Sequence, residues 1–283
     1  MNKQPVIILG MHRSGTTMIT KILENLGLYV GAEKEENHEA LFFWEINNWI
    51  FDLHTARPEL PHNMQYTNPK TRQIIEESLQ YFVQSPRKKK YLGNLNSNYK
   101  SLQALDFNFG WKDPKNTFTL EFWKSIFPNP KIIHVYRNPI DCISSYIERD
   151  LVMKNQFQWD WKKKLKRRFL ITHKFNYNFR LFDLEQGFQL WEEYVQKAID
   201  LKKDNANYLA IKYEQLLQNP EAEINNMLQF CELTPTKEAI HQQINTLQKD
   251  RAYAFVKNEQ YVSFYKKIQN NELLKILGYQ NIV

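Results

Sequence analysis

Residues 6–17 read VIILGMHRSGTT, an apolar run that passes directly into a glycine-rich turn. Four apolar residues between Pro5 and Gly10 are typical of a strand that is buried on both faces of a parallel sheet. Apolar side chains then recur at helical spacing from Met18 to Leu26, and Gly27 stands where a helix commonly ends. The stretch therefore predicts a strand, a tight loop and a helix, in that order.

Strand-like and helix-like segments alternate along the rest of the chain. Further strands are expected at Lys131–Tyr136, at Tyr208–Tyr213 and, after a polar turn at Arg87–Lys90, at Tyr91–Leu95. Helices are expected from Asn138-Pro139, an N-cap and a first-turn proline, to about Arg149, from Glu185 to Lys203 and from Glu221 to Phe230. This alternation favours the α/β class, with a central parallel sheet flanked by helices in three layers.

The composition is that of a globular chain. Of 283 residues, 42% are hydrophobic and 14% aromatic, which excludes a wholly disordered chain, and eight Gly and eleven Pro exclude a collagen-like one. Without internal repeats or a Gly/Ser-rich linker, we expect a single domain over residues 1–283.

The apolar runs and the cysteines bear on the compartment. No run approaches the ~20 apolar residues of a membrane span, and the apolar start is too short for a signal peptide. Cys142 and Cys231 are too few for a disulfide framework or a CxxC metal site. We therefore expect a cytoplasmic protein without a transmembrane segment.

Positive charge exceeds negative charge, with 38 Lys and Arg against 31 Asp and Glu, a net charge of +7. This balance predicts anionic partners of an unspecified class. The excess is concentrated in a basic insertion at about residues 150–180, where Trp and Phe are interleaved with basic residues. These are Lys154, Lys162, Lys163, Lys164, Lys166, Arg167, Arg168, Lys174 and Arg180. The insertion either faces an anion or is a solvated helix face with ordinary aromatic anchors.

The loop at residues 10–17, GMHRSGTT, has the spacing of a P-loop. A glycine turn that enters a helix presents backbone N–H groups and the positive end of the helix dipole to one point, which makes an anion site. Nucleotide triphosphatases have Lys after the second glycine, where this chain has Thr16, and the cation stands at Arg13 instead. The loop therefore predicts a P-loop-like fold in which Arg13 binds a terminal oxyanion bidentately. The missing Lys argues against hydrolysis of Mg·ATP.

This loop resembles the 5′-phosphosulfate loop of sulfotransferases that use 3′-phosphoadenosine 5′-phosphosulfate (PAPS). The resemblance implies cofactor-binding roles for Arg13, Ser14, Gly15, Thr16 and Thr17. The second signature of the family is an Arg at a strand end and a Ser eight residues later, which together grip the 3′-phosphate. Arg137 and Ser145 match it, with Ser144 as a less well-registered candidate.

Three further segments extend the resemblance over about residues 5–230. The segment GWKDP at residues 110–114 is similar to the one whose Lys contacts the transferring sulfonate, which implies that role for Lys112. The segment at residues 213–217 resembles one whose Tyr approaches the adenine, here Tyr213. ENHEALFFWE at residues 36–45 looks like the acceptor-side segment of glycan sulfotransferases, whose Glu ahead of an aromatic pair is the base, here Glu39.

Three departures separate the chain from the cytosolic small-molecule branch of that family. Arg13 replaces a Lys, and Pro114 stands where that branch has a catalytic His. Its C-terminal glycine-rich phosphate loop is also missing, and Arg251 and Lys257 are unregistered candidates to replace it. The resemblance is therefore closer to the bacterial and glycan-type branch.

The resemblance implies a PAPS-dependent sulfotransferase that moves a sulfuryl group to a hydroxyl or amine and releases adenosine 3′,5′-bisphosphate. Charge in a loose transition state builds mainly on the leaving phosphate oxygen, so Arg13, Lys112 and the loop N–H groups are predicted to stabilise it without a metal ion. Glu39 is predicted as the base, and His38, Asp113 and Glu45 are the alternatives.

Two other functions stay open, a nucleotide kinase or ATPase with a degenerate P-loop and a non-catalytic polyanion-binding protein. The kinase requires a Lys and metal carboxylates that the sequence does not show, and the binder would show strong salt dependence without nucleotide turnover. The expected acceptor is a small molecule or a glycan, with an anionic acceptor among the options. No specific nucleic acid is expected, and contact with a membrane surface and the oligomeric state are open.

Overall fold

The computed structural model describes residues 2–159 and 179–283. The chain forms two compact units, one from residues 1–137 and 193–252 and the other from residues 138–192 and 253–283. The expectation of a single domain stays a prediction. The basic insertion predicted at 150–180 falls largely on residues 160–178, which lie outside the described residues.

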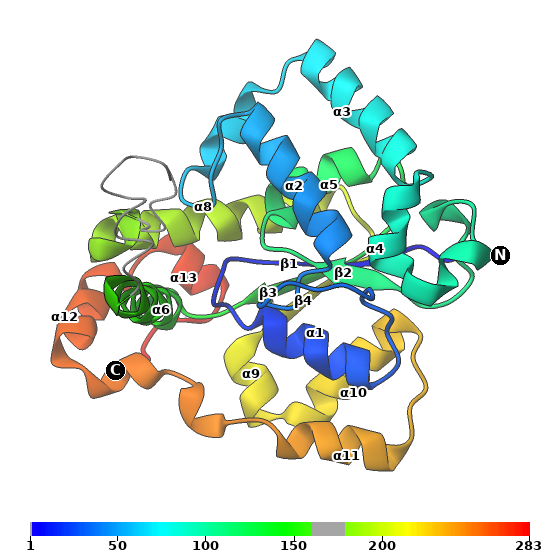
Figure 1. The fold of residues 1–283 in the computed structure, drawn as a ribbon. Helices are drawn as coiled ribbons and strands as arrows, with labels where there is room; N and C mark the ends of the chain where they lie inside the picture. The colour runs from blue at the N-terminus through cyan, green and yellow to red at the C-terminus, as the bar shows by residue number, and fades with distance from the viewer. Residues whose placement is uncertain (1, 160–178) are drawn as a thin grey trace. The chain divides into compact units, whose positions relative to one another are not determined.

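The first unit is built on a four-stranded parallel sheet with the strand order β2-β1-β3-β4 (Figure 1). The strands are β1 (Val6–Leu9), β2 (Gly110–Lys112), β3 (Lys131–Tyr136) and β4 (Tyr208–Lys212). The strands predicted at residues 6–9, 131–136 and 208–213 are confirmed. The three residues of β2 were not predicted, because so short a segment carries no readable periodicity.

Helices cover both faces of this sheet (Figure 1). On one face lie α1 (Thr16–Asn25), α9 (Tyr213–Gln218), α10 (Pro220–Cys231) and α11 (Lys237–Asn245). On the other lie α2 (Leu41–Leu53), α3 (Pro69–Phe82), α4 (Lys89–Leu92), α5 (Asn116–Trp123) and α8 (Leu184–Lys203), whose residues from 193 on belong to this unit. The prediction of a three-layer α/β fold with a central parallel sheet is confirmed.

The central strand β1 feeds two hydrophobic cores. Val6 and Ile8 pack with the helices of one face, and Ile7 and Leu9 pack with those of the other. Each of the four is at most 2% exposed, and burying one such side chain contributes about 1.5–3 kcal/mol. Burial on both faces explains why the run is entirely apolar. Because all three strand pairs are parallel, the carboxyl ends of the four strands lie at one edge of the sheet.

The second unit contains α6 (Pro139–Trp159), the first part of α8, α12 (Glu259–Ile268) and α13 (Glu272–Ile276), with the short turns η5 (Phe179–Phe182) and η7 (Ala254–Lys257). The predicted start of α6 is confirmed, because Asn138 Oδ1 accepts a hydrogen bond from the N–H of Asp141 at 2.9 Å. The Asp141 carboxylate in turn accepts hydrogen bonds from the N–H groups of Ala254 and Phe255, at 3.2 and 2.9 Å. This carboxylate therefore ties η7 to the first turn of α6.

The strand predicted at Tyr91–Leu95 is wrong, and so is the polar turn before it. Residues 86–98 form η2 (Pro86–Lys88), α4 and η3 (Gly93–Asn98). Tyr91 is fully buried and its hydroxyl donates to the Gly110 carbonyl at 2.8 Å, which places it in the core from a helical turn. Gly93 then turns the chain at φ 55°. A short apolar run does not by itself distinguish a strand from such a turn.

Two smaller expectations concern the cysteines and the membrane. Cys142 and Cys231 are both buried free thiols. Within residues 2–159 and 179–283, no helix has the length and apolar character that crossing a membrane requires.

Candidate functional site

The carboxyl edge of the sheet gathers most of the residues that the sequence singled out. β1 leads into the 10–17 loop, and Lys112 is the last residue of β2. Arg137 follows β3, and Tyr213 follows β4. All of these residues belong to the first unit. Ligands of open α/β sheets bind at this edge.

The 10–17 loop requires its two glycines. Gly10 has φ 140° and Gly15 has φ 102°, values that side-chain-bearing residues rarely adopt. A β-carbon on Gly10 would lie 2.2 Å from the carbonyl oxygen of Val135, and one on Gly15 would lie 2.4 Å from Cδ2 of Tyr213. Arg13, also left-handed at φ 68°, is exposed between them. The loop therefore packs closely against β3 and the Tyr213 ring, and the side chain of Arg13 is exposed to solvent.

At the end of this loop, several hydrogen-bond donors have no acceptor within the helix that follows. Gly15 is the N-cap of α1 and no side chain caps the helix, so the N–H groups of Thr16, Thr17 and Met18 have no acceptor within it. Ser14 is 1% exposed, and its Oγ has no hydrogen-bond partner among the described residues. A buried hydroxyl without a partner calls for an explanation, and an anion at the positive end of the helix supplies one.

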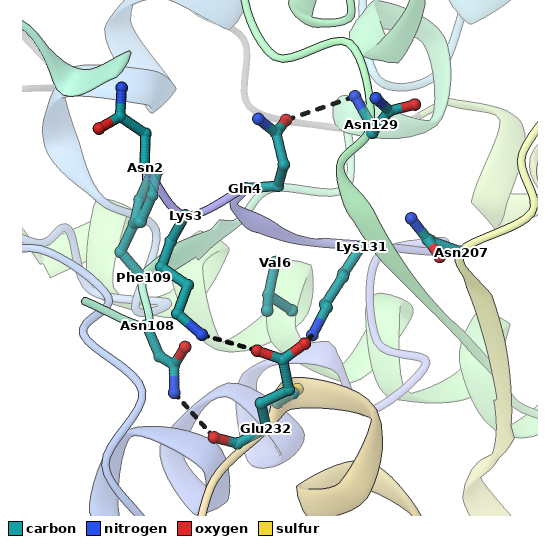
Figure 2. A pocket seen from close by; sticks show the side chains of 11 residues that line it. Asn2, Lys3, Gln4, Val6, Asn108, Phe109, Asn129, Lys131, Asn207 and Glu232 are labelled. Carbon is teal, nitrogen blue, oxygen red and sulfur yellow. Dashed lines mark hydrogen bonds and ion pairs between the residues drawn. The ribbon is translucent and has the colours of Figure 1, made fainter. Parts of the chain in front are cut away.

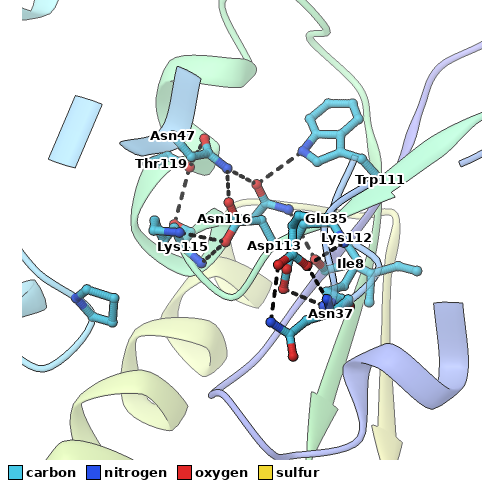
Figure 3. Close-up of polar contacts among 12 residues, drawn as sticks. Ile8, Glu35, Asn37, Asn47, Trp111, Lys112, Asp113, Lys115, Asn116 and Thr119 are labelled. Carbon is cyan, nitrogen blue, oxygen red and sulfur yellow. Dashed lines mark hydrogen bonds and ion pairs between the residues drawn. The ribbon is translucent and has the colours of Figure 1, made fainter. Parts of the chain in front are cut away.

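Lys112 is buried beside this loop. It is 1% exposed, and its Nζ donates to the Asn37 carbonyl at 2.6 Å (Figure 3). The same Nζ donates to Glu39 Oε1 at 2.5 Å. Thr17 Oγ1 donates to the same carbonyl at 3.0 Å. The Asn37 carbonyl therefore joins the first turn of α1 to the ammonium group of Lys112.

Glu39 shares its surroundings with a second carboxyl group. It is 5% exposed, and burial, a side-chain hydrogen bond with Glu35 and the charge of Asp113 together raise the pKa of Glu39 to about 8, against the attraction of Lys112. Burial acts to raise the pKa of Glu35 as well, but hydrogen bonds from the Glu39 side chain and from the backbone N–H groups of Glu39 and Asn37 lower it overall. The pKa values of the two carboxyl groups are thus shifted in opposite directions, upward for Glu39 and downward for Glu35.

Arg137 and Tyr213 contact each other at the ends of β3 and β4. The guanidinium carbon of Arg137 lies 4.5 Å from the centroid of the Tyr213 ring, and its Nη2 donates to the carbonyl of Arg251 at 2.7 Å. The Tyr213 ring also packs on Gly15. Tyr213 thus connects the 10–17 loop to Arg137, and Arg251 contributes its backbone. Ser145 and Lys257 belong to the second unit, so the pairing of Ser145 with Arg137 stays a prediction.

The three alternative bases have other partners. Asp113 is fully buried and accepts hydrogen bonds from Asn47 Nδ2 at 3.0 Å and from the Lys115 N–H at 2.9 Å (Figure 3). His38 contacts the Glu24 carboxylate through Nε2. Glu45 pairs with Lys90 at 2.6 Å. Within the described part of the chain, Glu39 is the candidate base that contacts Lys112.

Sequence reasoning missed Glu35, Asn37 and Asn47. Asn47 is fully buried in α2, and both polar atoms of its side chain are hydrogen-bonded. Its side-chain amide N–H₂ donates to Asp113 and Asn116, and its side-chain carbonyl accepts from Thr119 (Figure 3). The same carbonyl accepts a hydrogen bond from Nε1 of Trp123 at 2.9 Å. This network fixes the turn that follows Lys112. A polar residue within the apolar run of α2 was the available signal for Asn47, and the spacing of four residues from Glu39 was the signal for Glu35.

A cavity of about 330 Å³ opens at the opposite, amino edge of the sheet (Figure 2). Lys3 and Lys131 pair there with Glu232, at 2.7 and 2.6 Å. None of the predicted site residues lines this cavity. As for metal ions, residues 2–159 and 179–283 contain no group of three His, Cys, Asp or Glu placed to hold one, and the expectation of metal-free chemistry stays a prediction.

Known proteins resemble this chain at low identity. An uncharacterized protein of Aquifex aeolicus (strain VF5) is 23% identical over 249 residues, which cover 82% of this chain and 26% of that protein. The chain thus spans about a quarter of that relative. The sulfotransferase domain of the Synechococcus PCC 7002 olefin synthase is 18% identical, covering 89% of this chain and 80% of that one, with a TM-score of 0.45. A retinol dehydratase in complex with retinol and PAP is 16% identical, covering 89% and 66%, with a TM-score of 0.34.

The family comparison covers most of the chain. The model of the sulfotransferase family matches residues 5–238. That range contains the 10–17 loop, the Glu39 turn, Lys112, Arg137 and Tyr213. The chain belongs to the sulfotransferase family.

Proposed function

We propose that this protein transfers a sulfuryl group from PAPS to a hydroxyl or amine of a small-molecule or glycan acceptor. The observation that carries the proposal is that the 10–17 loop and the buried Lys112 meet at one carbonyl group. The Asn37 carbonyl accepts hydrogen bonds from both Thr17 and Lys112, and the neighbouring Ser14 hydroxyl is buried without a hydrogen-bond partner among the described residues. A loop that binds an anion and a cation set beside it are what a sulfuryl donor requires. Membership of the sulfotransferase family supports the same reaction class.

The residues at the carboxyl edge fit such a donor. Ser14 Oγ and the N–H groups at the start of α1 would hold the 5′-phosphosulfate, with Arg13 as its exposed cation. Arg137, together with Ser145, would hold the 3′-phosphate. Tyr213 packs on both Gly15 and Arg137, so its role includes holding these two parts in register. When bound, PAPS supplies the sulfuryl group, whose bond to the 5′-phosphate oxygen breaks as a bond to the acceptor forms.

Lys112 and Glu39 divide the remaining chemistry. Lys112 stabilises the negative charge that develops on the leaving oxygen. Glu39, once ionised, takes the proton of the acceptor hydroxyl or amine, so the proton ends on its carboxylate. Because the pKa of Glu39 is about 8, its basic form becomes populated as the pH rises toward that value. We therefore expect kcat/KM to rise with pH through this range.

Nucleotide binding tests the proposal. In calorimetry without magnesium, adenosine 3′,5′-bisphosphate is expected to bind at least ten- to a hundredfold more tightly than AMP or ATP, because charge-assisted hydrogen bonds to the 3′-phosphate contribute about 1.5–3 kcal/mol each. R137A should remove this preference. Lys131→Ala, at the amino edge of the sheet, is the matched control and should retain it. In a second titration with magnesium present, tighter binding of ATP than of adenosine 3′,5′-bisphosphate would instead favour a kinase. Salt-sensitive polyanion binding without nucleotide preference would favour a non-catalytic binder.

A further inference from the structure

The turn between Glu33 and Leu41 holds two carboxyl groups at one place. The Glu35 N–H donates to the Glu39 carbonyl at 3.0 Å, and the Leu41 N–H donates to the Glu33 carbonyl at 2.8 Å. His38 closes the turn with φ 71°. This backbone arrangement fixes residues 35 and 39 face to face, whatever their side chains.

The Glu35 carboxylate is held by the turn itself. Its Oε1 accepts hydrogen bonds from the N–H groups of Asn37 and Glu39, at 2.5 and 3.2 Å, and its Oε2 accepts one from Asn37 Nδ2 at 3.2 Å. Three donors from the turn favour the ionised form of Glu35. Its remaining contact, the side-chain hydrogen bond with Glu39, then requires a proton on Glu39.

The charges around Glu39 do not balance. It faces Glu35 from its own turn, Lys112 from β2 and Asp113 from the segment after β2. Asp113 is itself paired with Lys115, at 3.5 Å. One ammonium group, Lys112, therefore serves two carboxyl groups, and carboxyl groups that share a site cannot both ionise easily.

We propose that Glu35 is a positioning residue for Glu39: the two form a proton-sharing carboxyl pair in which Glu35 holds the Glu39 carboxyl against Lys112 and sets the pH at which Glu39 becomes a base. The base role of Glu39 rests on the proposed function, but the carboxyl pair does not. Loss of the shared proton leaves two carboxylates against one lysine, so Glu39 ionises at a higher pH than an ordinary glutamate. Removal of the Glu35 charge relieves this repulsion.

Carbon-13 NMR of the protein labelled at its glutamate carboxyl carbons tests the pair without any substrate. In the wild-type protein, one carboxyl that is absent from E39Q should titrate near pH 8, and one that is absent from E35Q should titrate below 4.5. E35Q should lower the titration midpoint of Glu39 by about one unit or more, a tenfold change in proton affinity. Glu36→Gln, an exposed glutamate in the same turn, is the matched control and should leave it in place. A wild-type Glu39 that titrates near 4.5, or one that E35Q does not move, would overturn the proposal.

The pH profile of sulfuryl transfer separates this proposal from the proposed function. The rising limb of kcat/KM should move to lower pH by the same amount in E35Q, with activity retained above the new midpoint, which a merely structural role would not produce. An unmoved limb in an active enzyme would contradict the role of Glu35. A complete lack of transfer in the wild type would contradict the proposed function, and the NMR titration would still decide on the pair.

Discussion

The two edges of the sheet carry similar lysine–glutamate contacts with opposite consequences. At the carboxyl edge Lys112 meets Glu39 at 2.5 Å, and at the amino edge Lys131 meets Glu232 at 2.6 Å. The first pair is buried, with side chains 1% and 6% exposed, and the second is open, at 20% and 54%. The pKa of Glu39 is raised to about 8, chiefly by burial. The pKa of Glu232 is lowered to about 2, chiefly by its hydrogen bonds to Lys131 and Lys3.

Burial and the second neighbour of each glutamate together explain the difference between the pKa values of Glu39 and Glu232. Glu232 has a second lysine, Lys3, whereas Glu39 has a second carboxyl group, Glu35. Two cations around one exposed carboxylate stabilise its charge, and a buried pair of carboxyls with one cation retains a proton. Titratable groups perturbed by burial and a specific partner are typical of functional sites, whereas pairs at the surface are typically structural. The carboxyl edge is therefore where proton chemistry is expected.

Matched substitutions of the two glutamates should give the largest contrast. E39Q keeps the shape of the side chain and removes its proton affinity, so kcat for sulfuryl transfer should fall by about 10²- to 10⁴-fold. E232Q makes the same chemical change at the amino edge and should leave kcat within about twofold of wild type, because surface pairs contribute little. Initial rates with saturating PAPS and an acceptor compare the two. Equal rates in E39Q and wild type would move the base to His38, Asp113 or Glu45.

Substitution of the two lysines should give the next largest effect. Lys112→Met removes the cation beside the 10–17 loop, and kcat should fall by about 10²- to 10³-fold, the loss expected for one donor to a developing oxyanion. It also leaves Glu35 and Glu39 without their ammonium partner, so the rising limb of kcat/KM should move to higher pH. Lys131→Met is the control and should change neither quantity. The pH dependence of the steady-state rates measures both effects, and a kcat unaffected by Lys112→Met would remove Lys112 from the reaction.

Local sequence patterns were sufficient to predict the first strand, the loop and the helix after it. They were insufficient to predict the surroundings of the residues in the site. The apolar run at Val6–Leu9 and the spacing of Gly10 and Gly15 are local, and they correctly predicted β1, the 10–17 loop and α1. The three residues of β2 carry no local signal, although Lys112 ends that strand. The predicted strand at Tyr91–Leu95 failed because the apolar side chains there enter the core from a helical turn.

The chemistry of Glu39 depends on contacts that no local pattern encodes. Its partner Lys112 lies 73 residues away in the sequence. Asn47 donates a hydrogen bond to Asp113, which lies 66 residues further along the sequence. Resemblance to a family placed Glu39 and Lys112 in the same site, but it carried no information about burial or about the second carboxyl group of Glu35. The sequence therefore predicted which residues to examine, and the packing of α2, β2 and the Glu33–Leu41 turn determines their proton affinities.

The last expected contrast is in the pH dependence of stability, where the two edges should act with opposite sign. Glu39 has a folded-state pKa of about 8, above its ordinary value of 4.5, so its contribution to stability is fully present below pH 4.5 and is lost as the pH rises to 8. Glu232 has a folded-state pKa of about 2, so its contribution is present above pH 4.5 and is lost as the pH falls toward 2.

Urea unfolding of the wild type, E39Q and E232Q is measured at pH values from about 2.5 to about 8.5. The difference in the free energy of unfolding between the wild type and each variant gives the contribution of that glutamate. The wild-type minus E39Q difference should fall as the pH rises from 4.5 to 8, by at most about 1.4 kcal/mol per pH unit. The wild-type minus E232Q difference should stay within about 1 kcal/mol, because Glu232 is 54% exposed, and it should fall only below pH 4.5. Slopes of the same sign in both windows would show that burial does not separate the two pairs, and the carboxyl edge would then lose its distinction as the site of proton transfer.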